Sequence, residues 1–116
     1  MPTDRDQFFE ALDQLARALD ESFEMTGRMK ERIRQLQQAG GSGRPLREIV
    51  SREDPPLLVQ LLTESSALLQ SCGTQVRRTE VRTLYSEGMT MDEIAELFGV
   101  SRQRVSALLR ESRASS

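Results

Sequence analysis

The segment of residues 80–111 strongly constrains the fold, because it contains two short amphipathic stretches separated by a single glycine. Thr90 is suited to cap the first stretch as a helix, and Glu93 follows three residues later, which is the spacing of a capping box. Gly99 ends that helix at a position where a positive φ is usually required. Ser101 is suited to cap a second helix. The pattern therefore predicts two helices joined by a tight turn at Gly99.

Each of these short helices carries apolar residues on one face at helical spacing. On the first helix, Ala95 is small enough to let the second helix approach closely. On the second helix, the face opposite the apolar residues is polar and rich in arginine. The residues expected to pack the two helices together are Ile94, Ala95, Phe98, Gly99, Val105 and Leu108.

A small residue at Ala95, a glycine at Gly99 and a branched aliphatic residue at Val105 are separated by four and six positions. This spacing resembles the packing signature of the helix-turn-helix superfamily. The stretch FGVSRQRVSALLR is most similar to bacterial sigma-factor region 4 and resolvase-type domains. The resemblance covers roughly residues 77 to 112, and it implies a three-helix head that binds DNA. A helical hairpin that only packs would explain the apolar positions equally well, but not the polar face.

The resemblance also implies that the second helix enters the major groove with its first residues against the base edges. Arg102 and Gln103 are then the best candidates for reading sequence, because arginine bonds bidentately to guanine and glutamine to adenine. Ser106 would add a hydroxyl contact and Ala107 a contact with a thymine methyl group. The remaining candidates are better placed for phosphates, and these are Thr90, Ser101, Arg104 and Arg110.

Charge is distributed unevenly along the 116 residues, although the net charge is only −2. Residues 1–27 carry two arginines and seven carboxylates, whereas residues 101–116 carry four arginines and one glutamate. The positive end therefore coincides with the expected DNA-binding end. Because the global charge is so small, a single head should bind DNA weakly. Useful affinity would require two heads on one site, which predicts a homodimer.

Residues 5–38 predict one long helix, because apolar side chains recur alternately four and three residues apart. This seam consists of Phe8, Leu12, Leu15, Leu19, Met29, Ile33 and Leu36. The spacing is interrupted at Ser22 and Thr26, where the regular positions are polar. A register-fixing polar layer, a pocket and an exposed turn are all compatible with that interruption. Further apolar residues beside the seam favour a helix that packs in a bundle.

A glycine-rich joint and a short helical piece follow, and a second long helix is expected to begin at Pro56. The residues that keep the four-and-three spacing in it are Leu58, Leu62, Ser65, Leu69, Cys72 and Val76. This helix is too apolar to stand alone. It should pack on the first helix, either as a hairpin within one chain or in a four-helix dimer core. The expected dimer contacts are Phe8, Leu12, Leu15, Leu19, Leu58, Leu62 and Leu69.

Composition excludes several other functions. The chain has one cysteine, Cys72, and no histidine, so we expect no disulfide within the chain, no metal site, no cofactor and no catalytic triad. An enzyme is therefore not expected. No apolar stretch approaches the length of a membrane helix, and the N-terminus is polar and acidic, unlike a signal peptide. We expect a bacterial protein located in the cytoplasm and associated with the nucleoid.

Together these features predict an all-α fold, with long N-terminal helices in a hairpin or dimeric bundle followed by a three-helix head. The expected division lies at Gly73, giving a dimerisation or interaction region at 1–73 and a DNA-binding domain at 74–116. The expected function is sequence-specific regulation of transcription on duplex DNA. Two alternatives fit the same sequence. One is a module that docks on RNA polymerase, a sigma factor or another regulator, and the other is an architectural or recombination accessory protein.

Overall fold

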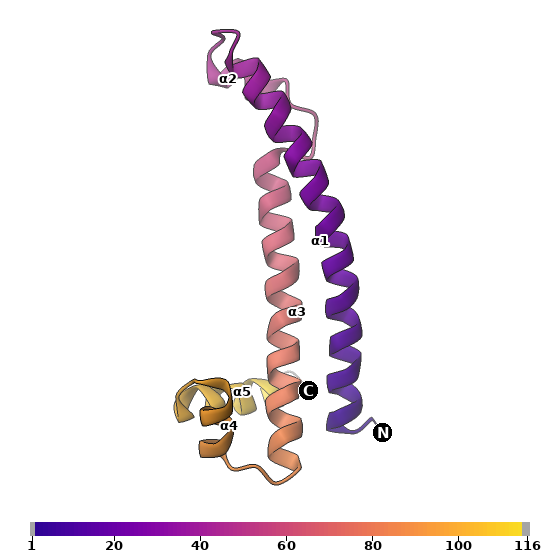
Figure 1. The fold of residues 1–116 in the computed structure, drawn as a ribbon, viewed down its shortest axis with the longest axis vertical. Coiled ribbons are helices and arrows are strands. Elements are labelled where there is room, and N and C mark those ends of the chain that lie inside the picture. Colours follow the sequence, from indigo (N-terminus) through magenta and orange to yellow (C-terminus); the bar gives the residue numbers. More distant parts are fainter. Residues whose placement is uncertain (1, 115–116) are drawn as a thin grey trace. The chain divides into compact units, whose positions relative to one another are not determined.

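The computed structural model describes residues 2–114, which form five α-helices and contain no β-strand (Figure 1). The helices are α1 (Asp4–Gly40), α2 (Leu46–Ser51), α3 (Leu58–Ser86), α4 (Met91–Phe98) and α5 (Arg102–Ala114). The predicted all-α fold is confirmed, as is the single long helix at the N-terminus. Within the described part of the chain, no helix has both the length and the apolar character needed to cross a bilayer.

Contacts divide the chain into two compact units. The first unit combines residues 1–17 with residues 71–116, and the second consists of residues 18–70. This division differs from the border expected at Gly73, because the first turns of α1 belong with the C-terminal part of the chain. In addition, α3 continues through Gly73 without interruption. The assignment of separate roles to 1–73 and 74–116 stays a prediction.

The second unit pairs the later part of α1 with the start of α3, which returns alongside it after α2 (Figure 1). Ala18 on α1 and Leu61 on α3 are buried. Ser22 also faces α3, because its Oγ lies 3.1 Å from Oγ of the buried Ser65 and the two hydroxyls share a hydrogen bond. Ser22, one of the two polar residues that interrupt the apolar spacing, therefore has a hydrogen-bond partner on α3.

Burial along α1 follows a seam that differs from the one predicted from spacing. Buried and partly buried residues recur every four and three positions, at Asp4, Phe8, Ala11, Leu15, Ala18, Ser22, Met25, Met29, Arg32, Leu36 and Ala39, and Leu12 beside this seam is also partly buried. Leu19 and Ile33, which the spacing placed in the seam, are 52% and 41% exposed. The predicted seam was therefore displaced by one residue at these positions, since small and polar residues occupy the true one.

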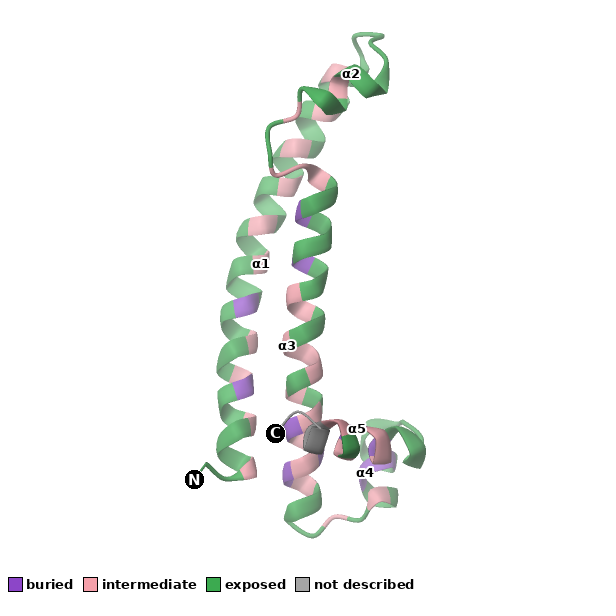
Figure 2. Cartoon of the chain, turned by 180° about the vertical axis from the view of Figure 1, so that it is seen from behind, coloured by how far each residue is buried: buried purple, intermediate pink, exposed green. Residues whose placement is uncertain are grey.

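The first unit contains a three-helix head formed by the end of α3 with α4 and α5. Its buried core consists of Val81, Ile94, Ala95, Val105 and Leu108, with Leu84, Met89, Met91 and Leu109 packed around it. Figure 2 shows buried segments, drawn in purple, on the end of α3 and on α4. Within the same unit, Ala11 of α1 is buried and Phe8 is half-buried.

The helix α3 begins at Leu58 and not at Pro56, where it was expected to begin. The peptide bond between Pro55 and Pro56 is cis. The Leu57 backbone N–H donates to the Gln60 side-chain carbonyl at 2.7 Å, and the Leu58 N–H donates to the Glu53 carboxylate at 3.0 Å. Side chains on both sides therefore cap the start of α3, and proline does not form its first turn.

Candidate nucleic-acid interface

The start of α4 is fixed by a capping box at Thr90. The Glu93 backbone N–H donates to Thr90 Oγ1 at 3.1 Å, and the Thr90 N–H donates to Glu93 Oε1 at 3.0 Å. These hydrogen bonds hold the pKa of Glu93 below its ordinary value, and the bond from the Thr90 backbone has the larger effect, ahead of the one to the Thr90 side chain. The capping box predicted from the sequence is confirmed. It sets the position from which α4 leads into the turn.

The turn between α4 and α5 depends on the backbone conformation of Gly99. Its φ is +67°, in the left-handed region that side chains disfavour, although a Cβ there would meet no atom within 4 Å. The Val100 N–H donates to the Ala95 carbonyl at 3.0 Å and closes the end of α4. Ser101 Oγ then accepts a hydrogen bond from the Arg104 N–H at 3.1 Å and caps α5. These local bonds make Arg102 the first residue of α5.

Packing between α4 and α5 holds the exposed face of α5 in place. Ile94 and Val105 are completely buried, and Ala95 and Leu108 complete the contact as expected from the sequence. Phe98 differs from its expected role, because it is 37% exposed and lies outside this core. It lines a groove of about 220 Å³ together with Val100, Val81 and Leu108.

The polar face of α5 is accessible at the positions expected to meet DNA. Arg102, Gln103 and Arg104 are exposed in the first turn, and Arg110 is exposed two turns later. Ser106 and Ala107 lie between them and are partly buried. Thr90 and Ser101 are also exposed at the starts of the two short helices, where they act as caps. The structure thus gathers the expected DNA-binding residues around α5, and their contacts with bases and phosphates stay a prediction.

Arg102 has a partner that the sequence pattern did not indicate. Its Nη1 lies 3.6 Å from Oδ2 of Asp92 on α4, and both side chains are largely exposed. Such a surface pair contributes at most about 1 kcal/mol and is weakened further by salt. Asp92 therefore restrains Arg102 only loosely. Asp92 and Arg102 lie ten residues apart on different helices, so the spacing rules for contacts within one helix could not predict this ion pair.

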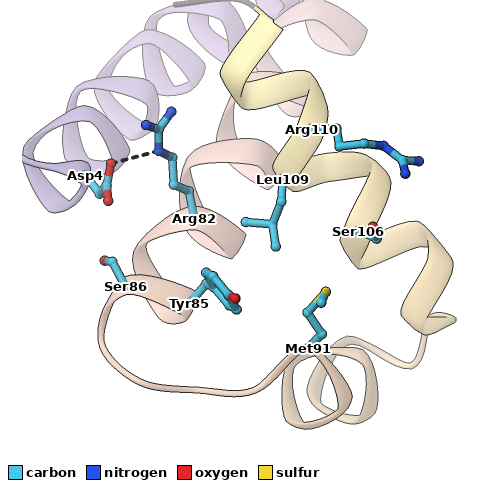
Figure 3. A pocket seen from close by; sticks show the side chains of 8 residues that line it. All are labelled: Asp4, Arg82, Tyr85, Ser86, Met91, Ser106, Leu109 and Arg110. Atoms are coloured by element: carbon cyan, nitrogen blue, oxygen red, sulfur yellow. Dashed lines mark ion pairs between the residues drawn. The ribbon is translucent and has the colours of Figure 1, made fainter.

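A second groove of about 300 Å³ lies between the end of α3 and α5 (Figure 3). The residues that line it are Asp4, Arg82, Tyr85, Ser86, Met91, Ser106, Leu109 and Arg110. Arg82 Nε lies 3.0 Å from Oδ1 of Asp4, the first residue of α1. Figure 3 shows the Arg82 side chain directed toward Asp4, whereas Arg110 extends from α5 in another direction. Asp4 and Arg82 were missed by sequence reasoning because 78 positions separate them.

Two short helices joined by a left-handed glycine, packed on a third helix and presenting a basic polar face, define a helix-turn-helix domain. Residues 76–115 match the family model described as Sigma-70, region 4. The match covers about a third of the chain, and it confirms the predicted resemblance of this segment to a helix-turn-helix DNA-binding domain of the region 4 type. No curated protein and no solved structure matches the chain.

Proposed function

We propose that this protein is a sequence-specific regulator of transcription that binds duplex DNA as a homodimer. The observation that carries the proposal is the exposed pair Arg102 and Gln103 at the start of α5, on a domain of the region 4 type. The opposite face of α5 is anchored by the buried residues Val105 and Leu108. A rigidly held helix with base-reading side chains at its N-terminus is suited to recognition in the major groove.

In this proposal, direct readout and attachment are performed by different residues. Arg102 and Gln103 would bond to base edges, where each good bidentate pair discriminates by about 1–3 kcal/mol. Ser101, Arg104 and Arg110 would contact phosphates, which fix the orientation of the head but carry no sequence information. No catalytic step is assigned to the chain. Operator binding would place the protein on the chromosome, in the cytoplasm of a bacterium.

The second unit offers a surface for dimerisation. Four of the large apolar side chains that are exposed there are Leu19 (52%), Phe23 (81%), Val59 (63%) and Leu62 (49%). Each follows a buried or partly buried residue by one position, these being Ala18, Ser22, Leu58 and Leu61. In two antiparallel helices such positions fall on the same side of the pair. These residues therefore form one apolar face, which we call the 19–62 face. The other flank of the seam carries Arg17, Glu21, Glu24 and Glu64.

A second copy of the chain is the occupant that best fits the 19–62 face. The four side chains are uncharged, so two copies related by a twofold axis can meet without like-charge repulsion. A single head on a chain of net charge −2 is expected to bind weakly, and dimerisation would supply the second head. Of the dimer contacts expected from the sequence, Leu19 and Leu62 lie on this face. The others are partly buried within the monomer, and these are Phe8, Leu12, Leu15, Leu58 and Leu69.

The proposal can be tested by substituting arginines on α5 in the full chain and measuring affinity for a panel of duplexes. We expect Arg102→Ala to change the ranking of the duplexes, because a base contact is lost. We expect Arg110→Ala to weaken all duplexes alike and to lower the slope of log affinity against log salt by about one. Arg44→Ala, an exposed arginine in the linker before α2, serves as the control. Equal weakening of every duplex by both α5 variants would contradict sequence reading.

A docking function on the transcription machinery is the second candidate, and one observation favours it. Phe98 and Val100 are 37% and 41% exposed beside the turn at Gly99, and they line the apolar groove that also reaches Arg104. Exposed apolar groups next to charged ones are typical of protein interaction sites. A chain that binds purified RNA polymerase or a sigma factor, but no duplex at low salt, would favour this candidate over DNA reading.

A further inference from the structure

The groove between α3 and α5 contains two arginines in different electrostatic situations. Arg82 is paired with Asp4 at 3.0 Å, and the two side chains are only 35% and 29% exposed. Arg110 forms no ion pair with any residue in the described part of the chain. Three side-chain hydroxyls, those of Tyr85, Ser86 and Ser106, line the same groove, and the Ser86 hydroxyl donates to the Thr83 carbonyl of its own helix. Guanidinium and hydroxyl donors are the side chains that most often contact DNA phosphates.

The position of Asp4 is determined by the local structure of the N-terminus. The Asp6 backbone N–H donates to Thr3 Oγ1, and the Thr3 N–H donates to Asp6 Oδ2, both at 3.1 Å. This reciprocal pair is a capping box, and it makes Asp4 the first residue of α1. Phe8, one turn later, is half-buried and lines a pocket with Thr83 and Leu84 of α3. The first turn of α1 is therefore docked on α3 and holds a carboxylate against Arg82.

We propose that Arg82 is a phosphate contact for DNA, and that in the unbound protein Asp4 occupies its guanidinium group as an internal substitute for the phosphate. The inference rests on the proposed function, because it requires α5 to lie on duplex DNA. Ser106 and Arg110 of α5 line the groove of Arg82, so a DNA backbone running beside α5 would reach this groove. A phosphodiester oxygen offers Arg82 the same negative acceptor that the Asp4 carboxylate provides.

Exchange of the Asp4 carboxylate for a DNA phosphate at Arg82 should affect the affinity for DNA and its dependence on salt. When Arg82 leaves Asp4 for a phosphate, one ion pair replaces another, and the freed carboxylate faces a DNA strand of like charge. Asp4 therefore reduces the affinity for DNA. Since the pair is partly exposed, its removal should strengthen binding only by about two- to fivefold at low salt. In Asp4→Asn, the positive charge of Arg82 is no longer offset by a neighbouring carboxylate. The slope of log affinity against log salt should therefore become steeper by about 0.9.

The experiment compares Asp4→Asn with Asp13→Asn in the full chain, using one duplex at several salt concentrations. Asp13 is an exposed residue of α1 without a described ion pair, so both variants lose the same charge from the same helix. We expect Asp4→Asn to bind two- to fivefold more tightly with the steeper slope, and Asp13→Asn to keep the wild-type slope. In a chain that already carries Arg82→Gln, no ion pair with Asp4 is left to break, so the change at Asp4 should strengthen binding less than it does in the wild type.

Three results would overturn the inference. The first is an equal change for Asp4→Asn and Asp13→Asn, which would indicate a general charge effect. The second is a gain from Asp4→Asn that is undiminished beside Arg82→Gln, because the gain would then not pass through Arg82. The third is weaker binding by Asp4→Asn, which would mean that Asp4 supports the DNA-bound arrangement. Wild-type protein that binds no duplex at low salt would instead reject the proposed function, and that outcome is distinct from all three.

Discussion

At the scale of single residues, the head is organised by short-range hydrogen bonds. Thr90 and Glu93 begin α4, Gly99 ends it in the left-handed region, and Ser101 begins α5. Each of these bonds joins residues within five positions of one another. They determine where Arg102 stands relative to the buried core, and so the residues that cap the helices also position the residue that is proposed to read bases.

The capping box at Thr90 should make the stability of the head dependent on pH. The pKa of Glu93 is lower in the folded chain than its ordinary value of 4.5, so the ionised form stabilises the fold. That stability is fully present above pH 4.5 and is lost as the pH falls through the lower folded-state pKa. We expect Thr90→Ala to lower the free energy of unfolding by about 1 kcal/mol at pH 7. We also expect it to remove this part of the pH dependence.

Urea unfolding at pH 7 and at several values below pH 4.5 measures both effects. Thr63→Ala is the matched control, because Thr63 is exposed in the interior of α3 and its hydroxyl donates only to the Val59 carbonyl of its own helix. A Thr90→Ala protein that is as stable as Thr63→Ala, with an unchanged pH profile, would show that the box contributes nothing to the stability of the head.

At the scale of helices, most of the bounds and caps of the helices were predicted correctly from the sequence. The residues by which one helix packs on another were predicted less well. The bounds of α1, the caps of α4 and the turn at Gly99 depend on neighbouring residues, so the sequence was sufficient to predict them. The seam of α1 was displaced at two positions, because Ala18 and Arg32 are buried or partly buried while their neighbours Leu19 and Ile33 are exposed. Ranking by hydrophobicity therefore favoured Leu19 over the smaller Ala18, although Ala18 is the buried residue.

The candidate site shows the same limit. The exposed residues of α5 were identified from the spacing of the helix-turn-helix, but Asp92 and Asp4 were missed as partners of Arg102 and Arg82. Contacts of this kind depend on how separate helices pack, and no periodicity in the chain records them. Phe98 was assigned to the core because it has the right spacing, yet it lies at the end of α4, where the core no longer covers it.

The 19–62 face gives a prediction for helix association. Phe23→Glu places a charge in the centre of the proposed dimer contact while disturbing little within the monomer, since Phe23 is 81% exposed. We expect the variant to sediment as a monomer, to keep its helical content and to bind an operator with two half-sites at least tenfold more weakly, because the second head is lost. Leu15 is a poorer test, because it is partly buried within the monomer.

Ala67→Glu provides the control for this experiment, since it adds the same charge to an exposed position on the opposite flank of α3. It should leave both sedimentation and DNA binding unchanged. Unaltered sedimentation of Phe23→Glu at the wild-type dimer mass would place the contact between copies elsewhere. A monomeric wild-type chain would remove the dimer from the proposal.

At the scale of the whole molecule, the chain combines a DNA-binding head with weak global charge. A net charge of −2 gives little non-specific attraction to DNA, so binding must depend on local arginines and on the number of heads. The acidic N-terminal residues and the basic α5 lie at opposite ends of the sequence, and Asp4 and Arg82 meet within one unit. Such a protein should release random DNA readily at moderate salt and retain only its own sites.

The most direct test of this account is selection of bound duplexes from a randomised pool with the full-length protein, followed by affinity measurements at two salt concentrations. A dimeric reader predicts an enriched palindrome with half-sites about one helical turn apart, bound at least 10³-fold more tightly than random duplex. A pool that shows no enrichment, with only weak binding that disappears at the higher salt concentration, would contradict sequence-specific recognition by α5.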